Sequence, residues 1–292
     1  MTHPGMYAAL LGLLVLAAPA ASTQPVGPSR IISLVPAATE MLFALGAGSR
    51  VAAVSSFDTF PPEVSKLPRV GALLDPDLER ILSLRPDLVV VYSTQTELRR
   101  QLDRAGIPQF LYKHARLDDV TVTIRELGTR VGESEAGARL AGAIESGVHE
   151  IRARVAGRER PRTLLVIGRE AGALRGMFVS GGFGFLHDML EAAGGTNVYS
   201  DVARESLQAS TEMVLARRPD VILEIRGSPV PDSAVQRERQ VWHALSSVPA
   251  VRTGRIHIIG DARTVVPGPR VAEGTELLAR ALHPGAFQED RR

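Results

Sequence analysis

A unit of one helix followed by one strand occurs twice in this chain, and this repetition constrains the fold more than any other feature. The first copy, "DPDLERILSLRPDLVVV", covers residues 75–91, and the second, "STEMVLARRPDVILE", covers residues 210–224. In each copy a glutamate, Glu79 or Glu212, lies seven residues before the proline of a Pro-Asp pair, and an apolar run follows. Each copy therefore predicts a helix that stops near the proline and leads into a buried strand.

A second pair of similar segments supports an internal duplication. "MLFALGAG" at residues 41–48 resembles "MLEAAGGT" at residues 189–196, and the two pairs occur in the same order along the chain. Two similarities in one order indicate a duplicated βα module. The alternative is that helix, Pro-Asp and strand form a common junction of α/β proteins without any duplication.

Short β-branched runs, separated by segments of helical spacing, predict an α/β fold. The strand candidates are residues 30–35, 50–55, 88–92, 109–112, 163–168, 221–225 and 255–260. After the first of them, Met41, Leu42 and Leu45 share one helical face, and Gly46 suits the position that follows a helix end. Strands that alternate with helices favour α/β layers with mostly parallel sheets.

One long segment interrupts this alternation. From Ser134 to Arg158 the chain has no proline, and apolar residues recur at steps of three and four residues. A helix of this length would extend roughly 35 Å, about the width of a small domain. We therefore expect an N-terminal α/β lobe at residues 30–130, a helical linker at 131–160 and a C-terminal α/β lobe at 161–286.

Charge and cysteine content exclude several classes of partner and chemistry. The formal net charge is only +2, and the 34 basic residues are spread along the chain without a basic block, so we expect no nucleic-acid partner. The chain has no cysteine. Disulfides, thiolate metal sites and a cysteine nucleophile are therefore excluded.

The first 22 residues have the pattern of a secretory signal peptide. An apolar stretch from Tyr7 to Ala18 precedes small residues at 20–22, and it is shorter than the roughly 20 apolar residues of a membrane span. Only His3 and the α-amino group supply positive charge before it, so an uncleaved membrane anchor is the alternative. We expect a soluble, exported mature protein without stable membrane insertion.

The sequence offers no motif for catalysis, a cofactor or a metal. Its histidines, at positions 3, 114, 149, 187, 243, 257 and 283, have no spacing typical of metal ligands, although His114 could face a cleft. Gly-rich "SGGFGF" at residues 180–185 lacks the GxGxxG pattern and the P-loop lysine, and GxSxG is absent. We therefore predict no catalytic residue, no metal site and no resident cofactor.

The two glutamates near helix starts carry more information. The predicted N-cap of the first helix is Asp75, with Pro76 as the first helical residue after it. The predicted N-cap of the second helix is Ser210. The helix dipole favours a carboxylate in the first turn, which explains acidity in each helix but not the matched placement in two lobes. Matched placement would give two separate negative positions, suited to a partner with two positive sites.

Five segments taken together are distinctive: "RIISLVPAATEMLFALGAGSRVAAVSSFDTFPPEV", "LPRVG", "DLERILSLRPDLVV", "SGGFGFLHDMLEAAGGTNVY" and "STEMVLARRPDVIL". In this order they resemble the periplasmic cobalamin-binding proteins of ABC importers, within the wider group of helical-backbone receptors for siderophores, haem and metals. The resemblance covers roughly residues 30 to 285. It implies two Rossmann-like lobes joined by one rigid helix, with a ligand cleft between them. It also implies a periplasmic, monomeric, non-enzymatic receptor whose Glu79 and Glu212 pair with arginines on the two subunits of a permease dimer.

The resemblance also implies which residues line the cleft. By similarity to the cobalamin binders these are Pro36, Phe60, Leu73, Tyr92, Phe178, Ser180 and Ser206. Phe60 stands where a tyrosine is usual, and Leu73 and Ser206 replace tryptophans, which removes rigid apolar contact area. A corrinoid is the first choice of ligand because the surrounding sequence fits best.

Basic residues near the predicted strand ends suggest a second kind of ligand. Lys113, Arg169, Arg226, Arg263 and Arg270 could meet an anionic chelate, and Arg226 and Arg263 are included among the candidate ligand contacts. A receptor for a ferric siderophore or for haem is therefore the first alternative. An exported α/β enzyme using the same cleft, or a sensor that contacts a membrane partner, are the others.

Overall fold

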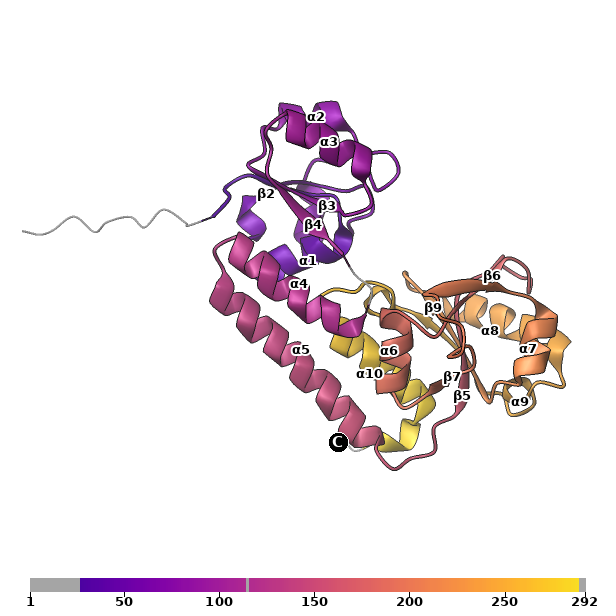
Figure 1. The fold of residues 1–292 in the computed structure, drawn as a ribbon. Coiled ribbons are helices and arrows are strands. Elements are labelled where there is room, and N and C mark those ends of the chain that lie inside the picture. The colour runs from indigo at the N-terminus through magenta and orange to yellow at the C-terminus, as the bar shows by residue number, and fades with distance from the viewer. Residues whose placement is uncertain (1–26, 114–115, 289–292) are drawn as a thin grey trace, which may run out of the picture.

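The protein consists of two α/β lobes held apart by one long helix (Figure 1). The structure is a computed structural model that describes residues 27–113 and 116–288. The predicted signal peptide and His114 lie outside these described residues. The expected fold class, two lobes with mostly parallel sheets joined by a backbone helix, is confirmed.

The N-terminal lobe is built on a fully parallel sheet with the strand order β2-β1-β3-β4. Its strands are β1 (Ile31–Ser33), β2 (Val51–Val54), β3 (Leu88–Tyr92) and β4 (Gln109–Tyr112), and its helices are α1 (Pro36–Ala44), α2 (Leu78–Ser83), α3 (Thr96–Arg104) and α4 (Leu117–Arg130). The central strands β1 and β3 are buried because both faces of the sheet are covered; all three residues of β1 are buried, and the apolar residues 88–91 of β3 have no exposed surface. Gly46 follows α1 with a φ of 85°, as the sequence predicts.

The C-terminal lobe has a mixed sheet with the order β10-β9-β5-β6-β8, and β7 pairs with β5. Its strands are β5 (Arg162–Gly168), β6 (Met177–Ser180), β7 (Thr196–Asn197), β8 (Ser206–Ala209), β9 (Val221–Arg226) and β10 (Ile256–Gly260), and its helices are α6 (Phe185–Ala192), α7 (Thr211–Arg217), α8 (Asp232–Val241), α9 (Pro249–Arg252) and α10 (Val271–Leu282). Strands β5, β9 and β10 are parallel, whereas β6 and β8 are antiparallel additions that the sequence did not predict.

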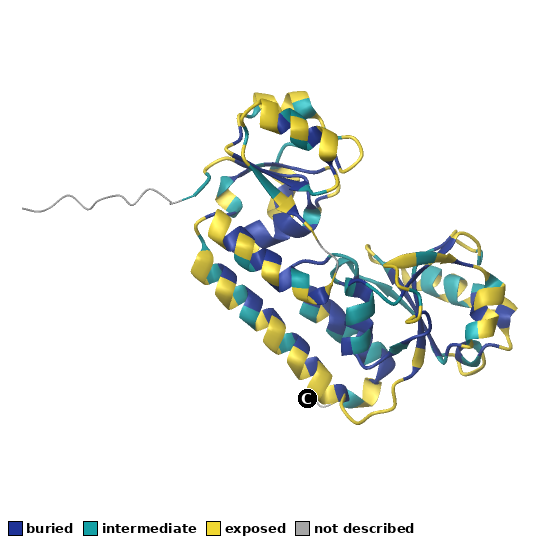
Figure 2. Cartoon of the chain, viewed as in Figure 1, coloured by how far each residue is buried: buried dark blue, intermediate teal, exposed yellow. Residues whose placement is uncertain are grey.

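The backbone helix α5 (Ser134–Val155) buries a single stripe against both lobes. Its buried residues are Gly137, Ala141, Ile144, Val148, Ile151 and Val155, and Figure 2 shows this stripe alternating with exposed residues. Gly137 lets α5 approach α4 closely, because a Cβ there would lie 3.1 Å from the carbonyl oxygen of Ile124. Helix α5 also packs on α10 of the other lobe, so it braces both lobes along its length.

The two copies of the repeated unit share an unusual backbone conformation. Arg85 and Arg218, each directly before the Pro-Asp pair, have φ values of 47° and 49°. They are the only residues other than glycine with positive φ in the described part of the chain. A left-handed residue ends each helix and turns the chain into the following strand. The predicted similarity of the two units therefore extends to their geometry.

Each copy is also tied to the first strand of its lobe in the same way. In the N-terminal lobe, the backbone amide of Arg30 donates to the Asp87 carboxylate at 2.8 Å, and the Arg30 side chain donates to the carbonyl of Leu84. In the C-terminal lobe, the amide of Arg162 donates to Asp220 at 3.1 Å, and its side chain donates to the carbonyl of Arg217 at 2.7 Å. Helices α2 and α7 therefore hold equivalent places in their lobes.

Two histidines of the C-terminal lobe have pKa values below the ordinary histidine value. Burial lowers the pKa of His257 on β10, and it lowers the pKa of His283, whose Nε2 lies 3.2 Å from the carbonyl oxygen of Gly194. The positive charge of Arg255 lowers both pKa values further. Both imidazoles therefore favour the neutral form in the folded protein.

We expect the free energy of unfolding to decrease as the pH falls from about 7.5 to about 5.5, because the unfolded chain binds protons at the ordinary histidine pKa of about 6.5 before the folded chain does. The double variant His257→Gln and His283→Gln should show a weaker dependence over this window. Urea denaturation followed by the fluorescence of Trp242 measures it. If the free energy of unfolding changed equally with pH in the wild type and the variant, these two histidines would not be the cause of the pH dependence.

Candidate functional site

The carboxyl ends of the parallel strands in the N-terminal lobe face the second lobe and carry a pair of tyrosines. Tyr92 ends β3 and Tyr112 ends β4, in register with each other. Their ring centroids lie 5.8 Å apart at 88°, an edge-to-face contact. The carboxyl edge of a parallel sheet is the usual place for a ligand in such folds.

A cavity of about 250 Å³ lies between the lobes at this edge. The N-terminal lobe contributes Pro36, Ala37, Tyr92 and Tyr112, and the C-terminal lobe contributes Phe185, Val265, Val266 and Pro267. Burial raises the pKa of the Tyr92 and Tyr112 hydroxyls, so both are neutral at ordinary pH. The cavity is therefore an uncharged, largely apolar space made by both lobes.

The structure brings two of the predicted contacts, Pro36 and Tyr92, into this cavity. Sequence reasoning missed Tyr112, although "LVVVY" and "QFLY" are both strands that end in tyrosine and thus indicate the same edge. It also missed Phe185, Val265 and Val266, which the C-terminal lobe contributes to the cavity. Residues 265–267 belong to an irregular segment, which has no periodic pattern from which its position could be inferred.

Two loops of the N-terminal lobe extend the apolar surface beyond the cavity. Phe60 and Leu73 are 38% and 41% exposed, and the unpredicted neighbours Phe57 and Leu74 are 72% and 93% exposed. Gln95, the N-cap of α3 just beyond β3, donates to the carbonyl of Leu73 at 3.0 Å and so ties one loop to the sheet edge. We call these four apolar residues the N-terminal rim.

The predicted contacts on the C-terminal lobe occupy two different environments. Phe178 on β6 is 49% exposed, and Ser206 on β8 is exposed and lines a smaller cavity of about 110 Å³ beside Phe185. Ser180, which pairs with Ser206 in the sheet, is fully buried, and its hydroxyl lies 3.0 Å from the carbonyl oxygen of Gly181. Ser180 thus lies beneath the surface that Phe178 and Ser206 present.

The arginines among the predicted basic contacts already have carboxylate partners within the chain. Arg226, at the end of β9, pairs with Glu224 and lies 3.8 Å from Glu238. Arg263 pairs with Asp261 at 2.6 Å and with Glu273 at 2.9 Å, which raises its pKa and lowers that of Asp261. An anionic ligand would therefore have to compete with these internal carboxylates.

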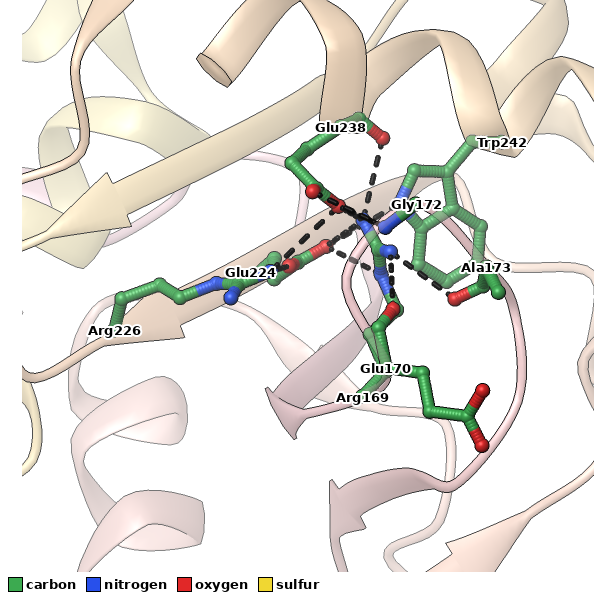
Figure 3. Close-up of polar contacts among 8 residues, drawn as sticks. All are labelled: Arg169, Glu170, Gly172, Ala173, Glu224, Arg226, Glu238 and Trp242. Atoms are coloured by element: carbon green, nitrogen blue, oxygen red, sulfur yellow. Dashed lines mark hydrogen bonds and ion pairs between the residues drawn. The ribbon is translucent and has the colours of Figure 1, made fainter.

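Arg169 is the most enclosed of these arginines (Figure 3). Its side chain and that of Glu224 have no exposed surface; Arg169 Nε donates to Glu224 at 3.0 Å, and its Nη2 lies 2.6 Å from Glu238. The indole nitrogen of Trp242 lies 3.4 Å from the same Glu224 oxygen. Arg169 therefore holds β5, β9 and α8 together rather than presenting a charge to the cleft. Lys113, by contrast, is exposed after β4.

The glutamates at positions 79 and 212 occupy matched places on the surface. Each is the second residue of its helix, α2 or α7, and each is exposed. The N-cap of α7 is Ser210, as predicted, but the N-cap of α2 is Asp77 rather than Asp75. The chain from Gly71 to Asp75 folds back on itself so closely that a Cβ added at Gly71 would lie 2.1 Å from the Asp75 carbonyl oxygen, and the helix begins after this loop.

Both glutamates lie on parts of their lobes away from α5, on α2 and α7 (Figure 1). Hydrogen bonds from the Ser210 side chain and from its own backbone amide hold the pKa of Glu212 below its ordinary value, so it is ionised. Within residues 27–113 and 116–288, neither carboxylate takes part in an ion pair. They are two separate negative charges available to another molecule.

The described residues contain no cluster of three or more His, Asp or Glu side chains placed to hold a metal ion. Over the same ranges, no helix combines the length and apolar character that crossing a membrane requires.

Comparisons with known proteins agree with this architecture. A family model described as periplasmic binding protein matches residues 31–262. A vitamin B12-binding protein of Pectobacterium carotovorum is 32% identical over 228 residues, covering 77% of this chain and 79% of its own. An uncharacterized ABC transporter substrate-binding lipoprotein of Bacillus subtilis is 28% identical, covering 90% and 82%.

Solved structures show the same fold with different named ligands. The periplasmic vitamin B12 binding protein of Vibrio cholerae has a TM-score of 0.75 at 24% identity, over 89% of this chain and 98% of its own. A periplasmic heme-binding protein from Roseiflexus has a TM-score of 0.75 at 30% identity, over 89% and 100%. The matched residues and the paired lobes show that this chain belongs to the family of periplasmic binding proteins.

Proposed function

We propose that this protein captures a metal chelate outside the cytoplasm, with cobalamin or a related corrinoid as first choice, and delivers it to the permease of an ABC importer. The observation that carries the proposal is the cavity between the lobes, walled by apolar and aromatic side chains from both. The relatives named for vitamin B12 binding support the corrinoid. The protein acts as a monomeric receptor, and it neither makes nor breaks a covalent bond.

Affinity comes mainly from apolar contact. In this proposal Tyr92 and Pro36 contact the ligand from within the cavity, Phe60 and Leu73 contact it from the N-terminal rim, and Phe178 contacts it from the other lobe. Side chains of this kind supply the large, rigid contact area that a macrocycle requires. Ser206 adds a polar group, whereas Arg226 and Arg263 act as secondary contacts because internal carboxylates already hold them.

Haem is the second candidate, and two tyrosines in the cavity favour it. A tyrosine oxygen can serve as an axial ligand of haem iron. Burial raises the pKa of the Tyr92 hydroxyl, however, so a phenolate there would form only if the metal displaced the proton. A ferric siderophore stays a third candidate, which would use the paired arginines.

Optical titration of the purified protein with cyanocobalamin, cobinamide, haemin and a ferric siderophore decides between these ligands. We expect a saturable spectral change with a corrinoid, and a roughly tenfold weaker affinity in Tyr92→Ala, because the variant loses an aromatic wall worth about 1–2 kcal/mol. Leu111→Ala, on the strand β4 but outside the cavity, is the matched control and should bind normally. Saturation by haemin alone would replace the corrinoid with haem.

A further inference from the structure

One arginine of the C-terminal lobe reaches into the N-terminal lobe. Arg270, directly before α10, forms a two-point contact with Glu40 of α1, with Nε 2.9 Å and Nη2 2.6 Å from the two carboxylate oxygens. The Glu40 side chain is 4% exposed and that of Arg270 is 19% exposed. A planar guanidinium fork suits a carboxylate in this geometry, and the low exposure shields the pair from water and salt.

The same guanidinium supports a residue of the N-terminal rim. Its central carbon lies 3.7 Å from the centre of the Phe60 ring, which is a stacked cation-π contact. Since Arg270 covers one face of this ring, the 38% of Phe60 that stays exposed belongs to the remainder of the side chain. Arg270 is thus held between Glu40 along one edge and Phe60 over one face.

Other contacts between the lobes surround this arginine. The Tyr112 hydroxyl lies 3.4 Å from the carbonyl oxygen of Pro267, three residues before Arg270, and Arg116 pairs with Asp188 of α6 at 2.7 Å. Gly268 packs against α1, where a Cβ would lie 3.4 Å from a Glu40 oxygen. The start of α10 lies between the lobes in Figure 1. Moving the lobes apart here would separate Arg270 from both of its partners.

We propose that Arg270 is a positioning residue that sets the separation of the lobes and holds the Phe60 ring in place at the mouth of the cleft. The bidentate pair with Glu40 fixes the plane of the guanidinium, and the plane of the guanidinium fixes the ring that stacks on it. A lysine would keep the charge but lose both the fork and the flat stacking surface. The cleft is therefore largely preformed before a ligand arrives. The role of Phe60 toward a ligand rests on the proposed function, but the role of Arg270 between the lobes does not.

Distance measurements between the lobes test the first part without any ligand. The chain has no cysteine, so Arg104→Cys on α3 and Arg237→Cys on α8, both exposed, would carry two spin labels and no others. Pulsed electron paramagnetic resonance should give a narrow distance distribution for the parent protein. Arg270→Met should broaden it about twofold, and Arg270→Lys should fall between them, because lobes without this contact are free to hinge.

Two further variants make the result specific. Glu40→Gln keeps the shape of the side chain and a hydrogen-bond acceptor but removes the charge, so it should also broaden the distribution even if Arg270→Met folds poorly. Arg280→Met removes an arginine of the same helix whose ion-pair partner, Glu276, lies one turn away on α10 itself, so it should leave the distribution unchanged. A distribution for Glu40→Gln or Arg270→Met that superimposes on the parent's would overturn the proposal.

Binding of cyanocobalamin tests the second part. We expect its Kd to rise about tenfold in Arg270→Met and less in Arg270→Lys, mainly through faster dissociation, whereas Arg280→Met should bind as the wild type does. An unchanged Kd in Arg270→Met would refute the positioning of Phe60. If the wild type fails to bind cyanocobalamin, the proposed ligand is wrong, and the distance measurements still decide the role of Arg270.

Discussion

The double variant Glu79→Arg and Glu212→Arg is expected to abolish permease-dependent uptake while changing the affinity for the ligand by no more than about twofold. Each glutamate is exposed on the second position of a short helix, outside the cavity between the lobes. A partner that presents an arginine to each would meet like charges after the reversal, which costs several kcal/mol per contact. Uptake of labelled cobalamin by reconstituted permease, beside a binding titration, measures both quantities.

The matched control for this experiment is Glu135→Arg. Glu135 is also the second residue of an exposed helix start, on α5, and its carboxylate has only a loose 3.5 Å contact with Arg139. Its reversal should leave uptake intact, because α5 lies on the other side of the molecule from α2 and α7 (Figure 1). Normal uptake by the double variant, or equal loss in the control, would show that Glu79 and Glu212 are not the docking contacts.

The single variant Arg169→Met is expected to lower the free energy of unfolding by about 3–5 kcal/mol, because it leaves the buried carboxylate of Glu224 without its main positive partner. Arg226 contacts the other oxygen of Glu224, but it is 27% exposed and approaches from the strand end, so it cannot fill the enclosed position (Figure 3). Urea denaturation followed by the fluorescence of the single tryptophan, Trp242, measures this free energy. The indole of Trp242 contacts Glu224, so the probe lies beside the altered ion pair.

Arg175→Met provides the comparison for the buried arginine. Arg175 pairs with Glu170 at 3.1 Å in the same loop region, but their side chains are 78% and 55% exposed. An exposed pair of this kind contributes about 0–1 kcal/mol, so the control should unfold almost like the wild type. Similar losses in both variants would mean that the enclosure of Arg169 does not determine its contribution.

Local sequence patterns predicted several strands and the long helix of the fold. The strands β3 and β4 have the predicted bounds, and α5 begins at the predicted Ser134, because continuous apolar runs and a regular helical stripe are local signals. The antiparallel strands β6 and β8 were missed: each has four residues, and their pairing depends on partners distant in the sequence. The N-cap of α2 was misplaced by two residues because Asp75 and Asp77 both satisfy the local pattern, and only the fold-back at Gly71 separates them.

In the candidate site, too, residues marked by a local pattern could be predicted, and residues whose role depends on distant partners could not. Tyr92 could be placed at a sheet edge from its position at the end of an apolar strand. The arginines could not be assigned from sequence, because a guanidinium near a strand end looks the same whether it faces a ligand or a carboxylate. Arg169 and Arg270 pair with acids 55 and 230 residues away, which no local pattern connects to them, whereas Arg263 pairs with the nearby Asp261 as well as with Glu273.

The two-lobed α/β plan, the backbone helix and the matched glutamates could all be predicted from local patterns, since periodicity, Pro-Asp junctions and repetition are properties of neighbouring residues. Which charges pair within the protein, and which side chains contact each other between the lobes, became known from the folded structure. An ion pair such as Arg270 with Glu40, 230 residues apart, depends on how the two lobes pack, and neither segment alone contains a sign of it.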